Sequence, residues 1–377
     1  QPSQLVKQWI QKAAPGAQAA SGWQPPLLEG LAQGFSNRKN LAADFNHERM
    51  LLMQTCLESP SIIARKNAMH LLNAIGMPGK NESRAAMMKA EQIAGNKNLK
   101  EDERVNAIEF MTLEDPTPHE AFLKRLVNLQ TPVSIQVAAV RTLGGVKGEN
   151  ITKFLLDKWQ TLTPQVRSEA INTFLITDQR TKLFLDKVEL GEINKGAISW
   201  DQSVNLRSGG EQMNRARKLL TETDISRKDI IGQYQEAITM KGDVQKGKLI
   251  FQANCSMCHQ VAGKSGRAFG PDLGTVFAWP PADILTNILD PNKSIALGFD
   301  LWTVKLNNGK SVQGIISSET PTAVTLTNAA GEVFNITRQD IESISALNMS
   351  AMPIDLEKKI DKKQMADLLA FLKQMQQ

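Results

Sequence analysis

Two cysteines and a histidine stand within five consecutive residues of this chain, Cys255-Ser256-Met257-Cys258-His259. Cysteines at this spacing on one helical turn can each form a thioether to a vinyl group on the same edge of a haem, and the next residue then points its imidazole at the iron. Covalent attachment prevents loss of the haem. The motif therefore predicts one covalent haem c held by Cys255, Cys258 and His259, with His259 as an iron ligand.

Other chemistries of a Cys-X-X-Cys pair fit the sequence less well. A structural zinc site needs four ligands, and no second Cys or His pair follows at similar spacing. A thioredoxin-type motif needs a βαβ context and has no histidine directly after it. The isolated residues His47, His70 and His119 are expected at the surface or at helix ends. Cys56 lies in an apolar helical run and is expected to be a buried packing residue.

The chain before this motif has the pattern of a helical repeat protein. Apolar residues recur at helical spacing from about Gln24 to Glu222. Four segments share a long polar residue three positions before an alanine, and the alanines are spaced by 39, 32 and 31 residues: Arg65–Ala68, Arg104–Ala107, Gln136–Ala139 and Arg167–Ala170. A small residue at a fixed position lets neighbouring helices approach closely, so the pattern resembles HEAT or armadillo repeats in an α-solenoid. A non-repetitive helical bundle is the alternative.

Composition argues against two other classes of protein. The 377 residues carry a net charge of +5, and Lys and Arg are scattered rather than gathered in one run, so no nucleic-acid partner is expected. No apolar stretch approaches the roughly 20 residues that span a bilayer, so no transmembrane segment is expected. The sequence begins at Gln1 without a Met or a signal-peptide pattern, which predicts either a cleaved leader or a piece of a longer protein.

The residues around the cysteine motif resemble class I cytochromes c. Gly247 and Phe251 stand eight and four residues before Cys255, where that family has a small residue and an aromatic residue in its first helix. Downstream, the run Gly270-Pro271-Asp272-Leu273-Gly274 resembles the Gly-Pro turn that passes beneath the haem. The resemblance implies that Pro271 packs on the proximal face and that its carbonyl oxygen accepts the Nδ1 hydrogen of His259, which fixes the ring orientation.

A strand-rich insertion lengthens the interval from Cys258 to Met352 to 94 residues. Two pairs of segments each flank a glycine-containing turn: 301–306 and 311–316 around Asn307-Asn308-Gly309, and 323–327 and 333–336 around Asn328-Ala329-Ala330-Gly331. They predict two hairpins in a small antiparallel sheet at about 300–345. An amphipathic helix is expected at 361–375. The Gly-, Ser-, Asn- and Gln-rich stretch 191–215 predicts a loop or a poorly packed segment, and helical character returns around 213–220.

The order of the motifs resembles the haem-binding domain common in Planctomycetes and Verrucomicrobia. The shared features are Cys-X-X-Cys-His, Gly-Pro-Asp-Leu, Ile-Leu-Asp-Pro-Asn-Lys at 288–293, Trp-Thr-Val at 302–304, and Met352-Pro353 before the last helix. The resemblance covers about residues 240–377 and implies that Met352 is the sixth iron ligand. Met349, in the same loop, is the rival, and Met257 is not favoured. That family often adds helical repeats and a β-propeller similar to sugar dehydrogenases; no propeller is present in this sequence.

Three further residues are candidate contacts to the haem propionates or the haem edge. They are Arg267, Trp279 and Trp302. An ordinary surface arginine and two packed aromatic side chains are the alternative interpretation, and it is slightly favoured.

The sequence therefore predicts a mainly α protein with a HEAT-like α-solenoid at 1–222, a linker with a helix at 223–240, and a cytochrome c domain with its β insertion at 241–377. His/Met ligation leaves no open iron position and raises the reduction potential. We expect an electron carrier rather than an enzyme: a mono-haem cytochrome passing single electrons from a dehydrogenase to a later carrier or oxidase. An open-iron haem enzyme or sensor and a haem-bearing scaffold or interaction subunit are the alternatives. Haem is attached outside the bacterial inner membrane, so a periplasmic or otherwise extracytoplasmic location is expected.

Overall fold

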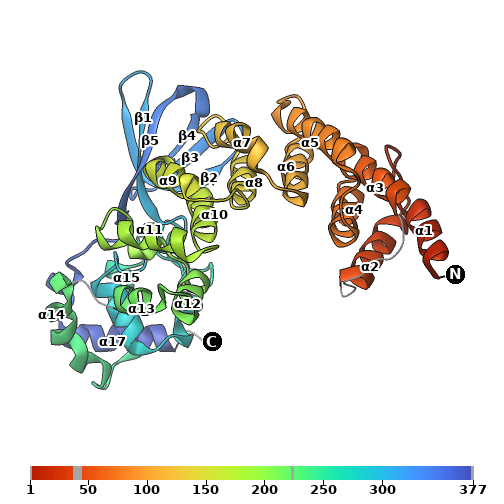
Figure 1. Cartoon of the computed structure of the whole chain (residues 1–377). Coiled ribbons are helices and arrows are strands. Elements are labelled where there is room, and N and C mark those ends of the chain that lie inside the picture. Colours follow the sequence, from red (N-terminus) through yellow and green to blue (C-terminus); the bar gives the residue numbers. More distant parts are fainter. Residues whose placement is uncertain (1, 37–44, 222–224, 375–377) are drawn as a thin grey trace. The chain divides into compact units, whose positions relative to one another are not determined.

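The computed structural model of the chain describes residues 2–36, 45–221 and 225–374 (Figure 1). The chain divides into two compact units, Gln1–Ile151 and Thr152–Gln377. The described residues are mainly helical and contain one five-stranded antiparallel sheet towards the C-terminal end, which confirms the predicted fold class. Within the described residues, no helix is both long enough and apolar enough to cross a membrane.

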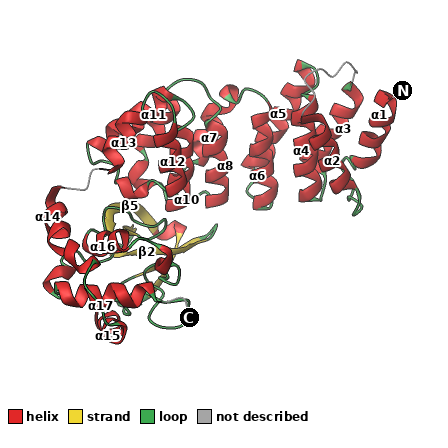
Figure 2. Cartoon of the chain, turned by 90° about the horizontal axis from the view of Figure 1, so that it is seen from below, coloured by secondary structure: helices red, strands yellow, loops and turns green. Residues whose placement is uncertain are grey.

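The first unit is a stack of short helices in two layers. Its helices are α1 (Pro2–Ala13), α2 (Gln24–Ser36), α3 (Asn46–Glu58), α4 (Ile62–Ile75), α5 (Lys80–Gly95), α6 (Glu101–Phe110), α7 (Glu120–Leu126) and α8 (Val133–Leu143). Helices α2, α4, α6 and α8 contact one another in sequence, and so do α1, α3 and α5. Figure 2 shows α1 to α6 standing side by side. Two layers of stacked helices are the arrangement of an α-solenoid.

The polar residues of the repeated sequence pattern occupy one kind of structural position. Each is buried and donates a side-chain hydrogen bond to a backbone carbonyl five to ten residues earlier: Arg65 to Ser59, Arg104 to Ala94, Gln136 to Thr131 and Arg167 to Trp159. The four alanines of the pattern, Ala68, Ala107, Ala139 and Ala170, are buried as well. The spacing found in the sequence therefore marks a recurring packing position, because each polar side chain satisfies a carbonyl that packing has removed from water.

The second unit contains the remaining helices and the sheet. Its helices are α9 (Asn150–Asp157), at the division, then α10 (Pro164–Phe174), α11 (Asp178–Glu189), α12 (Trp200–Ser208), α13 (Met213–Thr221), α14 (Ile225–Tyr234), α15 (Val244–Asn254), α16 (Pro281–Leu289) and α17 (Lys362–Lys373). The loop or poorly packed segment predicted at 191–215 is wrong over Trp200–Ser208, where α12 lies, whereas the helix expected from about Met213 is present as α13. Helix α12 begins with a capping box in which Ser199 accepts from the Gln202 N–H and the Gln202 side chain accepts from the Ser199 N–H.

The sheet has the strand order β4-β3-β2-β1-β5. Its strands are β1 (Asp300–Leu306), β2 (Ser311–Glu319), β3 (Ala323–Thr327), β4 (Val333–Thr337) and β5 (Ile341–Ser350). Both predicted hairpins are present, and their turns place Gly309 and Gly331 at φ values of 82° and 85°, which favour glycine. Strand β5 was not predicted. It pairs with β1, with Trp302 opposite Ala346.

The helices α15 and α17 cross at close range in the second unit. Just before α15, a Cβ on Gly242 would lie 2.3 Å from the carbonyl oxygen of Ala366 in α17, so this approach leaves no room for a side chain. Beside it the rings of Phe251 and Phe371 pack at 5.5 Å between centroids. The predicted closing helix is confirmed as α17, which Asp361 caps; its predicted last residue, Met375, lies outside the described residues. The domain limits 1–222, 223–240 and 241–377 stay predictions.

Candidate functional site

His259 is fixed by hydrogen bonds at its backbone and at its ring. Cys255 directly follows the last residue of α15, and its carbonyl accepts the His259 backbone N–H at 2.9 Å. The Nδ1–H of the ring donates to the carbonyl oxygen of Pro271 at 2.8 Å, which is the bond that the resemblance implies. Burial lowers the pKa of His259, and the Pro271 bond partly offsets this effect. The neutral ring therefore has Nε2 left as its metal-binding nitrogen.

Two glycines allow the loop 266–274 to lie directly against His259. A Cβ on Gly270 would fall 2.5 Å from Cε1 and 2.8 Å from Nδ1 of the imidazole. A Cβ on Gly266, which has a φ of 88°, would fall 2.0 Å from the His259 carbonyl oxygen. Because no side chain fits at either position, the backbone of this loop forms one wall of the histidine site.

The carboxylate of Asp272 holds the same loop in its conformation. It accepts the backbone N–H groups of Ala262, Gly263 and Gly274 at 2.7–2.8 Å. These bonds lower the pKa of Asp272, the bond from Gly274 contributing most. The ionised side chain thus connects the segment after His259 to the Gly-Pro turn.

The cysteines Cys255 and Cys258 are half-buried free thiols. Burial, with a smaller effect of Cys258, raises the pKa of Cys255 to about 11, and burial also raises the pKa of Cys258. A redox-active Cys-X-X-Cys pair needs a lowered pKa, so these thiols do not have the properties of a thioredoxin-type site. Two free thiols and a neighbouring imidazole whose Nε2 can bind a metal are the groups that a haem c requires. The residues therefore fit this group.

The two candidate methionines occupy different backbone environments. Met349 lies within β5 and is 44% exposed. Met352 follows the strand and is half-buried, and its backbone N–H donates to the Ser350 hydroxyl at 3.1 Å. The Ser350 backbone N–H donates in turn to Oδ1 of Asn292 at 2.8 Å. Met352 therefore lies beyond the strand, in a segment that the side chains of Ser350 and Asn292 hold by hydrogen bonds, whereas Met349 lies in the strand itself.

The other three predicted contact residues are spread over the second unit. Arg267 is exposed and donates to the Ala330 carbonyl at 3.0 Å, which connects the loop 266–274 to the β3–β4 turn. Trp279 is 44% exposed, and its carbonyl accepts from Lys373. Trp302 is fully buried, and the Arg167 guanidinium lies 4.8 Å from its ring centroid. A contact from any of them to a haem stays a prediction.

The rest of the described chain offers no competing site of this kind. In the described ranges there is no group of three or more His, Cys, Asp or Glu side chains that could hold a metal. Cys56 is buried, as predicted, and burial raises its pKa. His70 and His119 pair with Glu29 and Glu91, and His47 is exposed near the start of α3.

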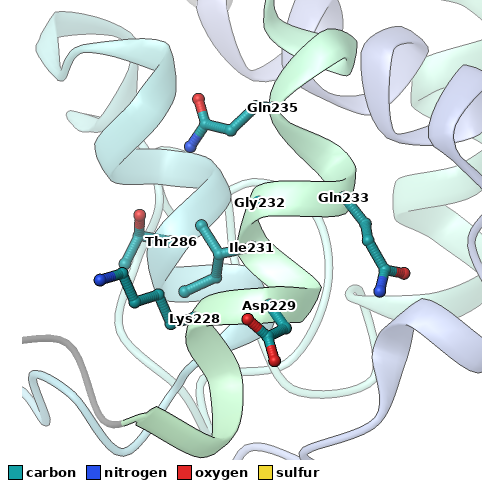
Figure 3. Close-up of a pocket in the computed structure, with 7 residues that line it drawn as sticks. All are labelled: Lys228, Asp229, Ile231, Gly232, Gln233, Gln235 and Thr286. Atoms are coloured by element: carbon teal, nitrogen blue, oxygen red, sulfur yellow. The ribbon is translucent and has the colours of Figure 1, made fainter.

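An open hollow lies beside α14, where it packs on α16 (Figure 3). It is lined by Lys228, Asp229, Ile231, Gly232, Gln233, Gln235 and Thr286. The side chains of Ile231 and Thr286 lie between the two helices. The lining carries one lysine and one carboxylate, Lys228 and Asp229, and neither a cysteine nor a histidine.

The family model for cytochrome c matches residues 244–347. This segment is a cytochrome c domain, preceded in the chain by a helical region, and such a domain implies covalent haem c and haem-based electron transfer. The match covers α15, Cys255, Cys258, His259 and most of the sheet, which is well under half of the chain. It ends before Met349 and Met352. No curated protein matches the chain.

Sequence reasoning did not single out the residues that hold the Met352 segment. Asn292 was quoted within the 288–293 motif, but no function was predicted for its side chain. Arg227, in the predicted linker, was not considered at all. Both act through contacts between residues far apart in the sequence, for which a single sequence offers no local signal.

Proposed function

We propose that this protein carries one haem c bound through Cys255, Cys258 and His259, with Met352 as the sixth ligand, and passes single electrons between partner proteins. The observation that carries the proposal is the hydrogen bond of 2.8 Å from His259 Nδ1 to the Pro271 carbonyl, directly beside two free thiols. A bound haem supplies an iron that changes between two oxidation states.

The residues around His259 suit a carrier better than an enzyme. The Pro271 carbonyl fixes the tautomer and the orientation of the ring, and Gly270 brings the backbone against it. An imidazole held in this way changes position little when charge changes nearby, which keeps the reorganisation of the protein small. A thioether from Met352 as the second protein ligand would leave no position for a substrate and would raise the reduction potential.

The partners and the location belong to the same proposal. We take a periplasmic or otherwise extracytoplasmic dehydrogenase as the donor and a later cytochrome or an oxidase as the acceptor. We further propose that the domain belongs to the haem-binding family common in Planctomycetes and Verrucomicrobia, with HEAT-like repeats before it. The two-layer helix stack and the recurring buried positions of Arg65, Arg104, Gln136 and Arg167 support the repeats. The stack offers an extended surface for binding a partner.

The test begins with protein made in cells that mature c-type cytochromes. Extraction with acidified organic solvent should leave the pigment on the polypeptide, because thioethers resist this treatment. When both Cys255 and Cys258 are replaced by alanine, the same extraction should remove any pigment from the polypeptide. A colourless protein, or pigment that is extracted from the unaltered protein, would overturn the proposal.

The sixth ligand is tested by the variants Met352→Ala and Met349→Ala. The oxidised protein should show the far-red charge-transfer band of an Fe–S(Met) bond. Met352→Ala should abolish the band and Met349→Ala should preserve it. The reverse outcome would assign the ligand to Met349, and absence of the band in the unaltered protein together with fast cyanide binding would favour the open-iron alternative.

A further inference from the structure

A partly buried arginine outside the matched domain contacts the end of the Met352 segment. The guanidinium of Arg227, in α14, makes a two-point contact with the Glu357 carboxylate, at 3.1 Å from Nη1 and 2.8 Å from Nη2. Its Nε donates to the Leu289 carbonyl at 2.8 Å. The side chains of Arg227 and Glu357 are only 12% and 13% exposed. An arginine that is partly buried and paired at two points is held in a defined orientation.

The backbone at this point needs such support. Asp355, three residues after Met352, has a φ of 72°, a left-handed conformation that a residue with a side chain seldom adopts. Its carboxylate lies 3.5 Å from Nη1 of Arg227. The hydroxyl oxygen of Tyr234, also in α14, lies 3.0 Å from the Glu357 carbonyl oxygen and 2.8 Å from that of Ile360, and it can donate its hydrogen to either. Helix α14 therefore contacts the chain from Asp355 to Ile360.

The start of the Met352 segment is held by the same part of the second unit. Asn292 receives the Ser350 N–H, as described above, and Asn292 stands three residues after Leu289, whose carbonyl Arg227 engages. The turn 289–292 thus connects the two ends of the segment 350–357. Helix α14 rests on α16, which leads directly into this turn (Figure 3).

We infer that Arg227 is a positioning residue for the sixth iron ligand, and that α14 is a working part of the haem site rather than a linker. The inference rests on the proposed function, with Met352 as ligand. A methionine thioether is a neutral and weak ligand, so its binding depends on a segment that is already in place. Releasing the Asp355–Glu357 end lets this segment open and increases the fraction of molecules in which the iron lacks its sixth ligand.

The experiment compares three variants with the unaltered full-length protein. Arg227→Met removes the ion pair and keeps an unbranched side chain, and Glu357→Gln removes the charge of its partner. The control is Arg215→Met, because Arg215 in α13 also makes a two-point contact with a carboxylate, that of Glu189 in α11, at 2.7 and 2.6 Å. It bonds to Asp186 as well, and both partners lie outside the Met352 segment. The probe is cyanide, which binds oxidised haem iron only when the methionine has left.

Arg227→Met should increase the rate of cyanide binding by about tenfold. Hydrogen bonds to charged groups contribute a free energy that corresponds to about a tenfold change in the population of the open segment. The far-red Fe–S(Met) band should weaken while the haem stays covalently attached. Glu357→Gln should act in the same direction, and Arg215→Met should leave rate and band unchanged. If Arg227→Met does not give folded protein by circular dichroism, Glu357→Gln, which weakens the same contact from the other side, decides the matter.

Failure of the inference is distinguishable from failure of the proposed function. The first case is that the unaltered protein has the Fe–S(Met) band, Met352→Ala loses it, and both Arg227→Met and Glu357→Gln bind cyanide at the unaltered rate. The inference about Arg227 is then wrong, and the proposed iron ligands stand. If the unaltered protein lacks the band, or keeps it after Met352→Ala, the proposed ligand itself is wrong. An equal acceleration in Arg215→Met would also overturn the inference, because the effect would then reflect general loosening.

Discussion

Gly247 in α15 lies against Asp367 in α17 so closely that a Cβ on the glycine would fall 2.0 Å from the Asp367 carbonyl oxygen. The Asp367 carboxylate accepts the backbone N–H of Asp243 at 2.7 Å at the same crossing. The first helix of the cytochrome c domain and the last helix of the chain therefore meet backbone to backbone. The small residue expected at position 247 has this contact as its physical reason.

Gly247→Val should destabilise the second unit by about 3 kcal/mol or prevent its folding, because the added atoms force the helices apart. Urea unfolding measures the change. Gly232→Ala is the control, since Gly232 lies in α14 with nothing within 4 Å of a new Cβ. That replacement should be neutral or stabilise by about 0.5 kcal/mol, because alanine favours helices. Equal effects of the two replacements would argue against the tight crossing.

Gly270→Ala should disturb His259 without touching either thiol. Its Cβ would collide with the imidazole ring, so the ring must turn and lose its bond to Pro271. The loss of such a supporting hydrogen bond should reduce haem incorporation by about tenfold. The ratio of haem absorbance to protein, measured on the purified variant, gives the result; normal incorporation with an unchanged spectrum would mean that the ring has space to move.

Glu319→Ala should be more damaging than Glu342→Ala in the same sheet. Glu319 pairs with Arg338, and these side chains are 7% and 3% exposed, whereas the pair of Glu342 and Lys305 is about half exposed. Removing Glu319 leaves a buried guanidinium without its carboxylate, which should cost about 3 kcal/mol. Removing Glu342 should cost at most about 1 kcal/mol. Thermal and urea unfolding of both variants provide the comparison.

The stability of the His259 loop should depend on pH through Asp272. Hydrogen bonds from backbone N–H groups, that of Gly274 first, hold the pKa of Asp272 below its ordinary value of 3.8. A carboxyl group whose pKa is lowered by folding stabilises the fold above its unfolded pKa, and this contribution is lost as the pH falls through the folded pKa. Asp272→Ala should therefore be less stable than the unaltered protein near neutral pH, and the difference should shrink below about pH 4. A constant difference over this range would exclude the carboxylate as the cause.

Much of the fold follows from local patterns in the sequence. Helical periodicity predicts the helices, and glycines at the turns predict both hairpins. Strand β5 escaped prediction because its pairing with β1 contains two register shifts, so its apolar residues Ile341, Ile344 and Ala346 do not keep a strict alternation. Helix α12 escaped because Ser208, Gly209 and Gly210 gave its C-terminal end the composition of a loop.

The residues of the candidate site also differ in how far the sequence alone predicts them. Cys255, Cys258 and His259 form one local motif with a fixed chemical purpose, so the sequence alone is sufficient to select them. Arg227 reaches Leu289 and Glu357 across 62 and 130 residues, and such contacts exist only once the chain has folded. No spacing rule connects these positions, and a residue in a presumed linker receives no weight in a motif search.

The Arg167 guanidinium lies between two indole rings, 5.0 Å from the centroid of Trp159 and 4.8 Å from that of Trp302. One of these rings comes from the helical region and the other from the first strand of the insertion. A fragment cut at the start of α15 would leave a large aromatic ring facing water and would tend to aggregate. Production of the haem-binding part by itself should therefore keep the chain from Thr152 onward.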